Sequence, residues 1–217
     1  MRKDNFIYLL LALIIFLVLL PILSDLQLAS EGLIRLIGFT CLLAIGVWSL
    51  RDSIPAFRLG VALMVIGIIS NVLAIANGAS VFNYLSQLAM FAFLLLAIVR
   101  ASRQVVWGVE MTANRLFGAI CVYLMLGILW AIMYSTLNSF VADSFAGATH
   151  VGSDDWNVEW IYYSFVTLTT LGYGDILPVS ATARVLAYSE AVFGVFYMAM
   201  LVSVLVSAYA AENRKQR

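Results

Sequence analysis

Charged residues are scarce in this sequence. Lysine and arginine together number 12, aspartate and glutamate also number 12, and charged residues make up only 11% of the 217 residues. A soluble globular domain carries roughly 25% charged residues and about 45–50% apolar ones, whereas 64% of this chain is hydrophobic. No soluble fold of this length can hide so much apolar surface, so the surplus is expected to face lipid. We therefore predict a membrane protein with several spans.

Other absences narrow the function further. The net charge is zero, so the chain lacks the basic excess that contacts with nucleic-acid phosphates require. The two cysteines, Cys41 and Cys121, lie within apolar runs and are interpreted as small buried hydrophobic residues. The single histidine, His150, is interpreted as a solvated loop residue. No nucleophile elbow, phosphate-binding loop or cluster of metal ligands is found, so we expect neither an enzyme nor a bound cofactor.

Long apolar segments dominate the chain instead. A helix needs roughly 20 mostly apolar residues to cross a hydrocarbon core about 30 Å thick. Short polar or turn-forming connections separate the first segments, which places neighbouring helices antiparallel. Six segments are predicted as spanning helices: 5–24, 32–50, 57–76, 81–99, 115–137 and 182–209.

Basic residues indicate the orientation of these helices. With the N-terminus in the cytoplasm, ten of the twelve basic residues lie in cytoplasmic segments, and only Arg35 and Arg184 lie outside. Membrane proteins carry an excess of lysine and arginine on the cytoplasmic side. We therefore predict a multi-pass protein with both termini in the cytoplasm. The shortness of the chain favours a plasma membrane of the prokaryotic inner-membrane type.

The connection 138–181 differs from the others because it is long and only partly polar. Its first part, Asn138 to Asp155, is polar, whereas Trp156 to Val166 is aromatic and apolar but too short to span. An apolar run of roughly 10–14 residues is typical of a buried or re-entrant helix. It is followed by Thr167-Leu168-Thr169-Thr170-Leu171-Gly172-Tyr173-Gly174-Asp175.

The two glycines of this motif suggest a specific chemistry. Gly172 and Gly174 allow left-handed backbone angles, and a chain that alternates in handedness can point successive carbonyls to one side. Four such chains around an axis would form rings of carbonyl oxygens that replace the hydration shell of a monovalent cation. Irregular backbone at membrane depth is tolerated only where it is buried or lines a water-filled path.

Residues 167–175 resemble the signature of the potassium channel superfamily. Further residues agree with the family's usual spacing, namely Tyr162, Tyr163, Pro178, Arg184 and Gly194. The resemblance covers about 115–210 and implies a helix–pore loop–helix unit. With four helices in front, the whole chain resembles the prokaryotic six-transmembrane type that has one pore loop.

The resemblance also implies which residues bind ions. Potassium ions, the only ligand expected, are implied at the backbone carbonyls of Thr170, Leu171, Gly172 and Tyr173, and Gly174 completes the selectivity filter. The Thr170 hydroxyl is implied to form the innermost ring. One chain supplies one filter segment and a pore needs four, so three further copies in a homotetramer are the simplest closure. Membrane lipids are the other expected partners.

Filter support and gating are implied for further residues. Tyr162, Tyr163 and Asp175 are implied to hold the filter from behind. Glu190 lies one turn before Gly194, and an ionisable residue at this depth is a functional-site hypothesis. Glu190 is interpreted either as a brace behind the filter or as a carboxylate that reaches water near the helix top. Gly194 is interpreted as a gating hinge, with a plain packing glycine as the alternative.

The front helices lack the features of a voltage sensor. Each sensor arginine that crosses the field is worth about 2.3 kcal/mol per 100 mV, but 81–99 contains none. We therefore predict weak or no voltage dependence. Asn71, Asn83 and Gln87 are polar at membrane depth. They are interpreted as interhelical hydrogen-bonding residues, and a lipid or small-molecule pocket is the alternative.

The predicted architecture is an all-α membrane protein: six transmembrane helices, a re-entrant pore helix and a selectivity filter, assembled as a homotetramer. Residues 1–99 are predicted as a sensor-like four-helix domain, 100–114 as an interfacial linker and 115–217 as the pore domain. The predicted function is passive, potassium-selective conduction. The alternative is a non-conducting or regulatory membrane subunit with a lipid-binding front domain.

Overall fold

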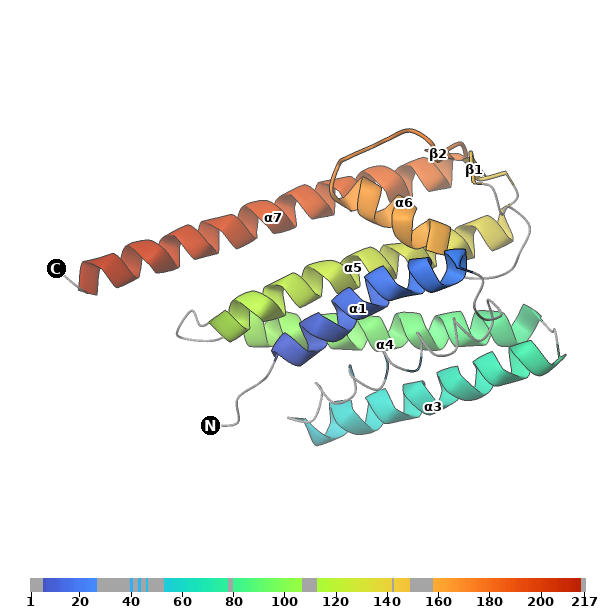
Figure 1. The fold of residues 1–217 in the computed structure, drawn as a ribbon, viewed down its shortest axis with the longest axis horizontal. Helices are drawn as coiled ribbons and strands as arrows, with labels where there is room; N and C mark the ends of the chain where they lie inside the picture. Colours follow the sequence, from blue (N-terminus) through green and yellow to red (C-terminus); the bar gives the residue numbers. More distant parts are fainter. Residues whose placement is uncertain are drawn as a thin grey trace.

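The computed structural model describes residues 6–26, 40, 43, 46, 53–77, 80–106, 113–141, 143–148 and 158–215. Most of the predicted span 32–50 lies outside these residues, as do Cys41, His150, Asp155 and residues 107–112. The described part is almost entirely helical (Figure 1).

The long helices coincide with predicted spans. They are α1 (Phe6–Asp25), α3 (Ile54–Asn77), α4 (Ser80–Val106), α5 (Ala113–Phe140) and α7 (Ala181–Lys215). Within the described residues, these five helices are long and apolar enough to cross a membrane. Length and composition therefore support a multi-pass membrane protein.

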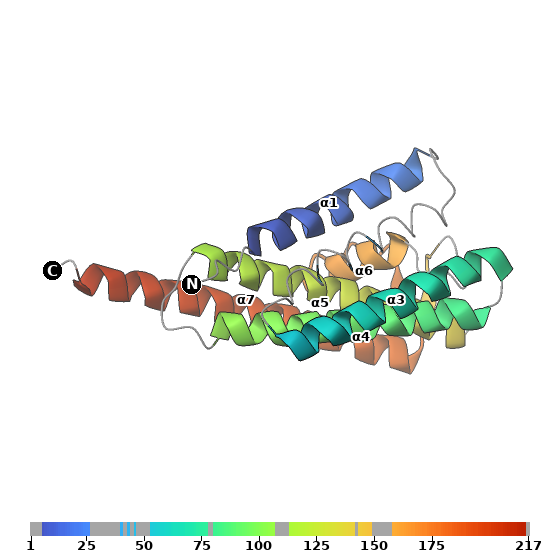
Figure 2. The same cartoon turned by 90° about the horizontal axis from the view of Figure 1, so that it is seen from below.

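Most of the helix packing involves α4 and α5. Helix α3 packs against α4, α4 against α5, and α5 also contacts α1 and the short helix α6 (Val158–Leu168), as Figures 1 and 2 show. Buried side chains such as Phe93 and Leu94 of α4 and Ile128 of α5 form one apolar core. Helix α5 therefore lies at the centre of the described fold.

Helix α4 is longer than the predicted span. Residues 100–106, expected to begin a linker, continue the helix to Val106. Arg100 donates a hydrogen bond from Nη2 to the hydroxyl of Ser53 at 2.8 Å, next to the start of α3. The positive charge of Arg100, which was expected to mark the end of the span, therefore has a hydrogen-bond partner while the helix continues.

A short β-ribbon closes the long connection between α5 and α7. Strands β1 (Phe145–Ala146) and β2 (Leu177–Pro178) pair antiparallel, with Phe145 opposite Pro178 and Ala146 opposite Leu177. Gly147 follows with a φ of 87°, and a Cβ there would lie 1.9 Å from the Asp175 carbonyl oxygen. Only glycine permits this approach, which ties the start of the connection to the end of the predicted filter. This ribbon was not predicted from the sequence.

Helix α7 is the most exposed of the five long helices that the structure describes. Only 11% of its apolar window is buried, against 56% for α5. Its C-terminal half extends beyond the other helices (Figure 1). Large apolar side chains such as Val192, Phe196 and Met200 are exposed along it. An apolar surface of this extent marks contact with lipid or with another chain.

Candidate functional site

Helix α6 presents the predicted filter segment. Its buried face includes Trp160, Tyr163, Ser164 and Val166. Gly127 of α5 allows the close approach, because a Cβ there would lie 2.6 Å from the Phe165 ring. The helix ends at Leu168, and an irregular segment, residues 169–175, leads back toward β2.

The end of α6 has a defined hydrogen-bond pattern. The amide of Leu171 donates to the carbonyl of Val166 at 2.9 Å, and the amide of Thr170 donates to the carbonyl of Thr167 at 2.9 Å. This pair of bonds is the Schellman motif, in which the residue after the helix is left-handed and is usually glycine. Here that residue is Thr170, with a φ of 58°. A β-branched residue in this conformation is strained by about 1–3 kcal/mol.

These bonds determine where the carbonyls point. The N–H and C=O of one trans peptide unit point in opposite directions. Because the amides of Thr170, Leu171 and Gly172 donate back to α6, the preceding carbonyls of Thr169, Thr170 and Leu171 point away from it. The structure thus directs two of the predicted ligand carbonyls, those of Thr170 and Leu171, to the side opposite α6.

Backbone handedness alternates along the same segment. Thr170, Gly172 and Gly174 have φ values of 58°, 60° and 78°, whereas the residues between them do not have positive φ. A Cβ at Gly172 or Gly174 would meet nothing within 4 Å in the chain. The two glycines are therefore required by backbone conformation and not by space within the chain.

Tyr162 and Asp175 contact each other across the segment. The Tyr162 hydroxyl donates to Asp175 Oδ2 at 2.5 Å. This bond lowers the pKa of the Asp175 carboxyl and, followed by desolvation and the nearby charge, raises the pKa of Tyr162 to about 12. Both shifts favour the neutral phenol beside the ionised carboxylate. The structure therefore brings together two of the residues predicted to support the filter.

Tyr163 lies elsewhere. Its ring is buried in an aromatic cluster, 4.8 Å from the ring centre of Tyr134, 5.5 Å from Phe145 and 6.4 Å from Trp160. These edge-on contacts join α5, β1 and α6. Tyr163 thus anchors α6 itself, and only Tyr162 of the aromatic pair reaches Asp175 within the chain.

Glu190 is buried where three helices meet. Its carboxyl is 0% exposed and lies 2.5 Å from the Tyr134 hydroxyl of α5 and 2.5 Å from the Ser164 hydroxyl of α6. The interpretation that Glu190 reaches water near the helix top is therefore wrong for this chain. Its partners are α5 and α6, not residues 169–175, so bracing of the filter stays a prediction.

Gly194 contacts the backbone of α6. A Cβ at Gly194 would lie 2.1 Å from the carbonyl oxygen of Leu168, so α7 and the end of α6 meet without an intervening side chain. The hydroxyl of Tyr123 also lies 3.5 Å from this oxygen. Helix α7 runs through Gly194 without a break. This contact agrees with the packing interpretation, and the hinge stays a prediction.

Sequence reasoning missed the partners of Glu190. Tyr134 and Ser164 are polar residues within otherwise apolar segments, which was an available signal. Among the described residues, no group of three His, Cys, Asp or Glu side chains is placed to hold a metal ion.

The chain is similar to known proteins over part of its length. Residues 120–211 match the family model described as "Ion channel". Two-pore potassium channel 4 of Arabidopsis thaliana is 32% identical over 88 residues, 39% of this chain and 30% of that protein. Two pore potassium channel c of Oryza sativa subsp. japonica is 34% identical over 85 residues, 39% of this chain and 17% of that protein.

A third relative is named as a regulatory subunit and not as a channel. A delayed-rectifier potassium channel regulatory subunit of Aotus nancymaae is 26% identical over 100 residues, 46% of this chain and 17% of that protein. The similarity thus spans less than a third of the length of each of these relatives.

Proposed function

The chain belongs to the potassium channel superfamily, and from this premise we propose that it is a subunit of a potassium-selective membrane channel. Four copies surround one axis, and each contributes residues 169–175 to a shared filter. Potassium ions then pass down their electrochemical gradient without an energy source.

The alternating handedness at Thr170, Gly172 and Gly174 carries this proposal. The alternation and the bonds back to α6 leave carbonyls free to line an axis opposite the helix. In the filter, the ion ligands are the carbonyls of Thr170, Leu171, Gly172 and Tyr173, and the Thr170 hydroxyl forms the innermost ring. Such rings substitute for the water shell of a potassium ion. Gly174 supplies the last left-handed residue.

Exposure supports assembly into a tetramer. Leu171 is 55% exposed and Tyr173 is 66% exposed in the single chain. Irregular backbone beside apolar side chains cannot face lipid, because its polar groups would lack partners there. A closed ring of four copies covers the segment and gives it a water-filled axis. The exposed apolar face of α7 supplies further contact surface between copies or with lipid.

The surrounding residues hold this geometry. Tyr162 and Asp175 support the outer end of the filter through their hydrogen bond. Tyr163 anchors α6 in the aromatic cluster, and Glu190 fixes α6 to α5 and α7. At Gly194, α7 packs directly against the end of α6, and the glycine also allows α7 to bend. A movement of α7 at this point would therefore displace the start of the filter segment.

The whole chain crosses the membrane six times, with both termini in the cytoplasm and segment 32–50 as the second span. The front helices respond weakly or not at all to voltage. Within α4, Arg100 and Arg103 lie in the last part of the helix, and Arg100 bonds to Ser53. Arginines at the helix end do not cross the field, so little gating charge moves. A steep conductance–voltage curve would contradict this part of the proposal.

The deciding experiment is a reversal potential. Purified protein is placed in a planar bilayer with potassium on one side and sodium on the other. A reversal near the potassium equilibrium potential is the expected result. A reversal near zero, with current flowing, would show that the carbonyl rings do not select potassium and would overturn the proposal.

A second candidate is a regulatory subunit that does not conduct alone. The relative from Aotus nancymaae is named as a regulatory subunit. Mass measurement of the purified complex separates the two candidates. Intact homotetramers that carry potassium current support the channel, whereas a chain that forms no homotetramer and carries no current supports the regulatory subunit.

A further inference from the structure

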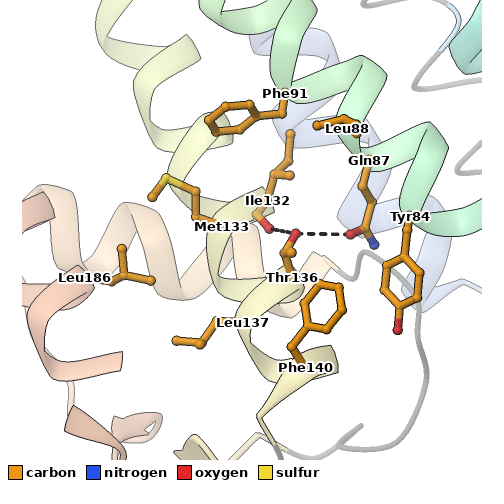
Figure 3. A pocket seen from close by; sticks show the side chains of 10 residues that line it. All are labelled: Tyr84, Gln87, Leu88, Phe91, Ile132, Met133, Thr136, Leu137, Phe140 and Leu186. Atoms are coloured by element: carbon orange, nitrogen blue, oxygen red, sulfur yellow. Dashed lines mark hydrogen bonds between the residues drawn. The ribbon is translucent and has the colours of Figure 1, made fainter. Parts of the chain in front are cut away.

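A cavity of about 530 Å³ lies between α4, α5 and the start of α7 (Figure 3). This volume is within the range of about 300–1,000 Å³ that is typical of small-molecule sites. The cavity is separate from residues 169–175, and none of the roles assigned above uses it. The lining residues indicate which kind of ligand the cavity can hold.

The cavity lies at membrane depth. All its lining residues belong to the membrane-span candidates Val81–Val105, Asn114–Phe140 and Ala181–Val204. Most of them are apolar, including Leu88, Phe91, Met133 and Leu137, and none is charged. A phosphate or ammonium group would be buried there without a partner of opposite charge, at high cost. The occupant is therefore apolar and uncharged along most of its length.

Polar groups lie toward one end of the cavity, where Tyr84, Gln87 and Thr136 line it. The Thr136 hydroxyl donates to the Ile132 carbonyl at 2.7 Å and lies 3.2 Å from Gln87 Oε1, as the dashed lines of Figure 3 mark. The amide nitrogen of Gln87 has no acceptor among the residues that the structure describes. Its two hydrogens can therefore serve an acceptor on a ligand.

The polarity changes along the cavity. Gln87 lies seven residues after Ser80, the first residue of α4, which is about 10 Å along the helix. Phe91 lies one turn, about 6 Å, further from that end of the helix. The hydrogen-bonding amide is thus nearer the membrane surface, and the apolar side chains of Phe91 and Met133 lie further toward its middle. A ligand that fits this order has a neutral acceptor at one end and a hydrocarbon tail.

We propose that this cavity binds one acyl chain of a membrane lipid, with the ester carbonyl of that chain accepting a hydrogen bond from Gln87. An acyl ester has the required uncharged acceptor followed by hydrocarbon. Leu186 places the start of α7 against the same occupant, so the lipid contacts the front helix α4 and both long helices of the C-terminal unit. The site does not depend on whether the chain conducts potassium.

Photolabelling tests the site directly. The full chain is reconstituted in bilayer discs containing a phosphatidylcholine with a diazirine on its acyl chain, irradiated, and mapped by mass spectrometry. Labels are expected on the α4 and α5 segments that contain Phe91 and Met133. Met133→Trp fills the cavity and is expected to lower this labelling at least fivefold. Leu95→Trp is the matched control, because Leu95 is an exposed α4 residue that does not line the cavity.

The carbonyl contact has its own test. One net hydrogen bond is worth about 1 kcal/mol, or about fivefold in binding. The ester lipid should therefore label the wild-type cavity about fivefold better than the matched ether lipid, which lacks the carbonyl. Gln87→Leu should remove this preference and keep the labelling by the ether lipid. This comparison needs no current, so it stands apart from any failure of the channel proposal.

Two results would overturn the proposal. One is equal labelling of the cavity segments in the wild type and in Met133→Trp. The other is an unlabelled wild-type cavity together with loss of the oligomer in Met133→Trp, because a second copy of the chain would then occupy the space. Leu137→Trp provides a second filling variant if Met133→Trp fails to fold, as judged by circular dichroism.

Discussion

The two sides of helix α6 differ in how many contacts they make within the chain itself. On the inner side, the Ser164 hydroxyl lies within hydrogen-bonding distance of both Glu190 and the carbonyl of Gly127, and Gly194 packs against the helix end. On the outer side, residues 169–175 are exposed, and the space around Gly172 and Gly174 is empty. The inner side is explained by contacts within one chain, whereas the outer side is the surface that the proposed assembly would cover.

This difference separates stability from conduction. Substitutions on the inner side remove contacts that the folded chain makes, so they should lower stability first and current as a consequence. Substitutions on the outer side remove at most the exposed hydrogen bond between Tyr162 and Asp175 from the single chain. They should change current, selectivity or its pH dependence while stability stays nearly constant.

The largest effect is expected on the outer side. Gly172→Ala places a methyl group on a residue with a φ of 60°, and the exposed segment can relieve this strain of about 1–2 kcal/mol only by losing the alternation of its carbonyls. We expect potassium current to fall by more than tenfold, with little change in the thermal midpoint of the chain. Current is measured in planar bilayers, and unfolding is followed by circular dichroism.

Gly147→Ala is the control for this prediction. Gly147 also has positive φ, but its Cβ position is occupied by the Asp175 carbonyl oxygen. Gly147→Ala should therefore destabilise the fold itself. Equal losses of stability in both variants would remove the distinction between the two sides of α6.

Glu190 should give the next largest effect, on the inner side. Glu190→Ala leaves the Tyr134 hydroxyl buried without its partner and a gap between α5, α6 and α7. The expected loss is about 2–5 kcal/mol in the free energy of unfolding. Thermal unfolding of the detergent-solubilised chain measures it.

Glu190→Gln is the matched variant because its amide can satisfy both neighbours. The amide oxygen can accept from Tyr134. The amide nitrogen can donate to Ser164, whose single hydrogen is then available to the Gly127 carbonyl 2.7 Å away. We expect Glu190→Gln to recover at least half of the stability that Glu190→Ala loses. Its reversal potential should lie near the potassium equilibrium potential. If alanine and glutamine variants were equally stable, the hydrogen bonds would not be what holds α6.

Gly194 distinguishes packing from hinge bending. Gly194→Ala brings a methyl group against the Leu168 carbonyl, and the overpacked contact should cost about 1–3 kcal/mol. If the glycine acted only by its flexibility, a glycine at the neighbouring Val195 would restore function to Gly194→Ala. We expect no such rescue in stability or in current, and recovery of both would establish the hinge instead.

The sequence predicted the spans well because lipid exposure leaves a signal in each residue. Long apolar runs identified α1, α3, α4, α5 and α7. Most of the predicted ends lie within a few residues of the observed ones, and the C-terminal ends of α4 and α7 are the exceptions. The end of α4 was missed because Arg100 looks like the end of a span, although its long side chain can reach Ser53 while the helix continues. The motif at 167–175 likewise indicated where irregular backbone follows a short helix.

Contacts between distant residues were not predictable in this way. Tyr134 and Glu190 are 56 positions apart, so no local period connects them. The ribbon of β1 and β2 has two residues in each strand, too few for an alternating pattern. What the sequence could not supply is therefore the three-dimensional closure around α6, which depends on where the helices meet.

The smallest effect is expected at the exposed contact between Tyr162 and Asp175. The pKa of Asp175 is lowered by the Tyr162 hydrogen bond, so the contact is complete above the usual carboxyl pKa and is lost as the pH falls through the lowered one. At the other extreme, the pKa of Tyr162 is raised to about 12, so the phenol stays a donor throughout the neutral range.

Tyr162→Phe removes the donor and should move the acid midpoint of the potassium current to higher pH, because the Asp175 carboxyl then protonates more readily. Neutral-pH stability should barely change, since both groups are solvated. The midpoint is read from current recorded over an acid pH series, with Tyr188→Phe on the exposed surface of α7 as control. An unmoved midpoint would mean that Asp175 has another partner in the assembly, and the outer side of α6 would then be held by a neighbouring copy.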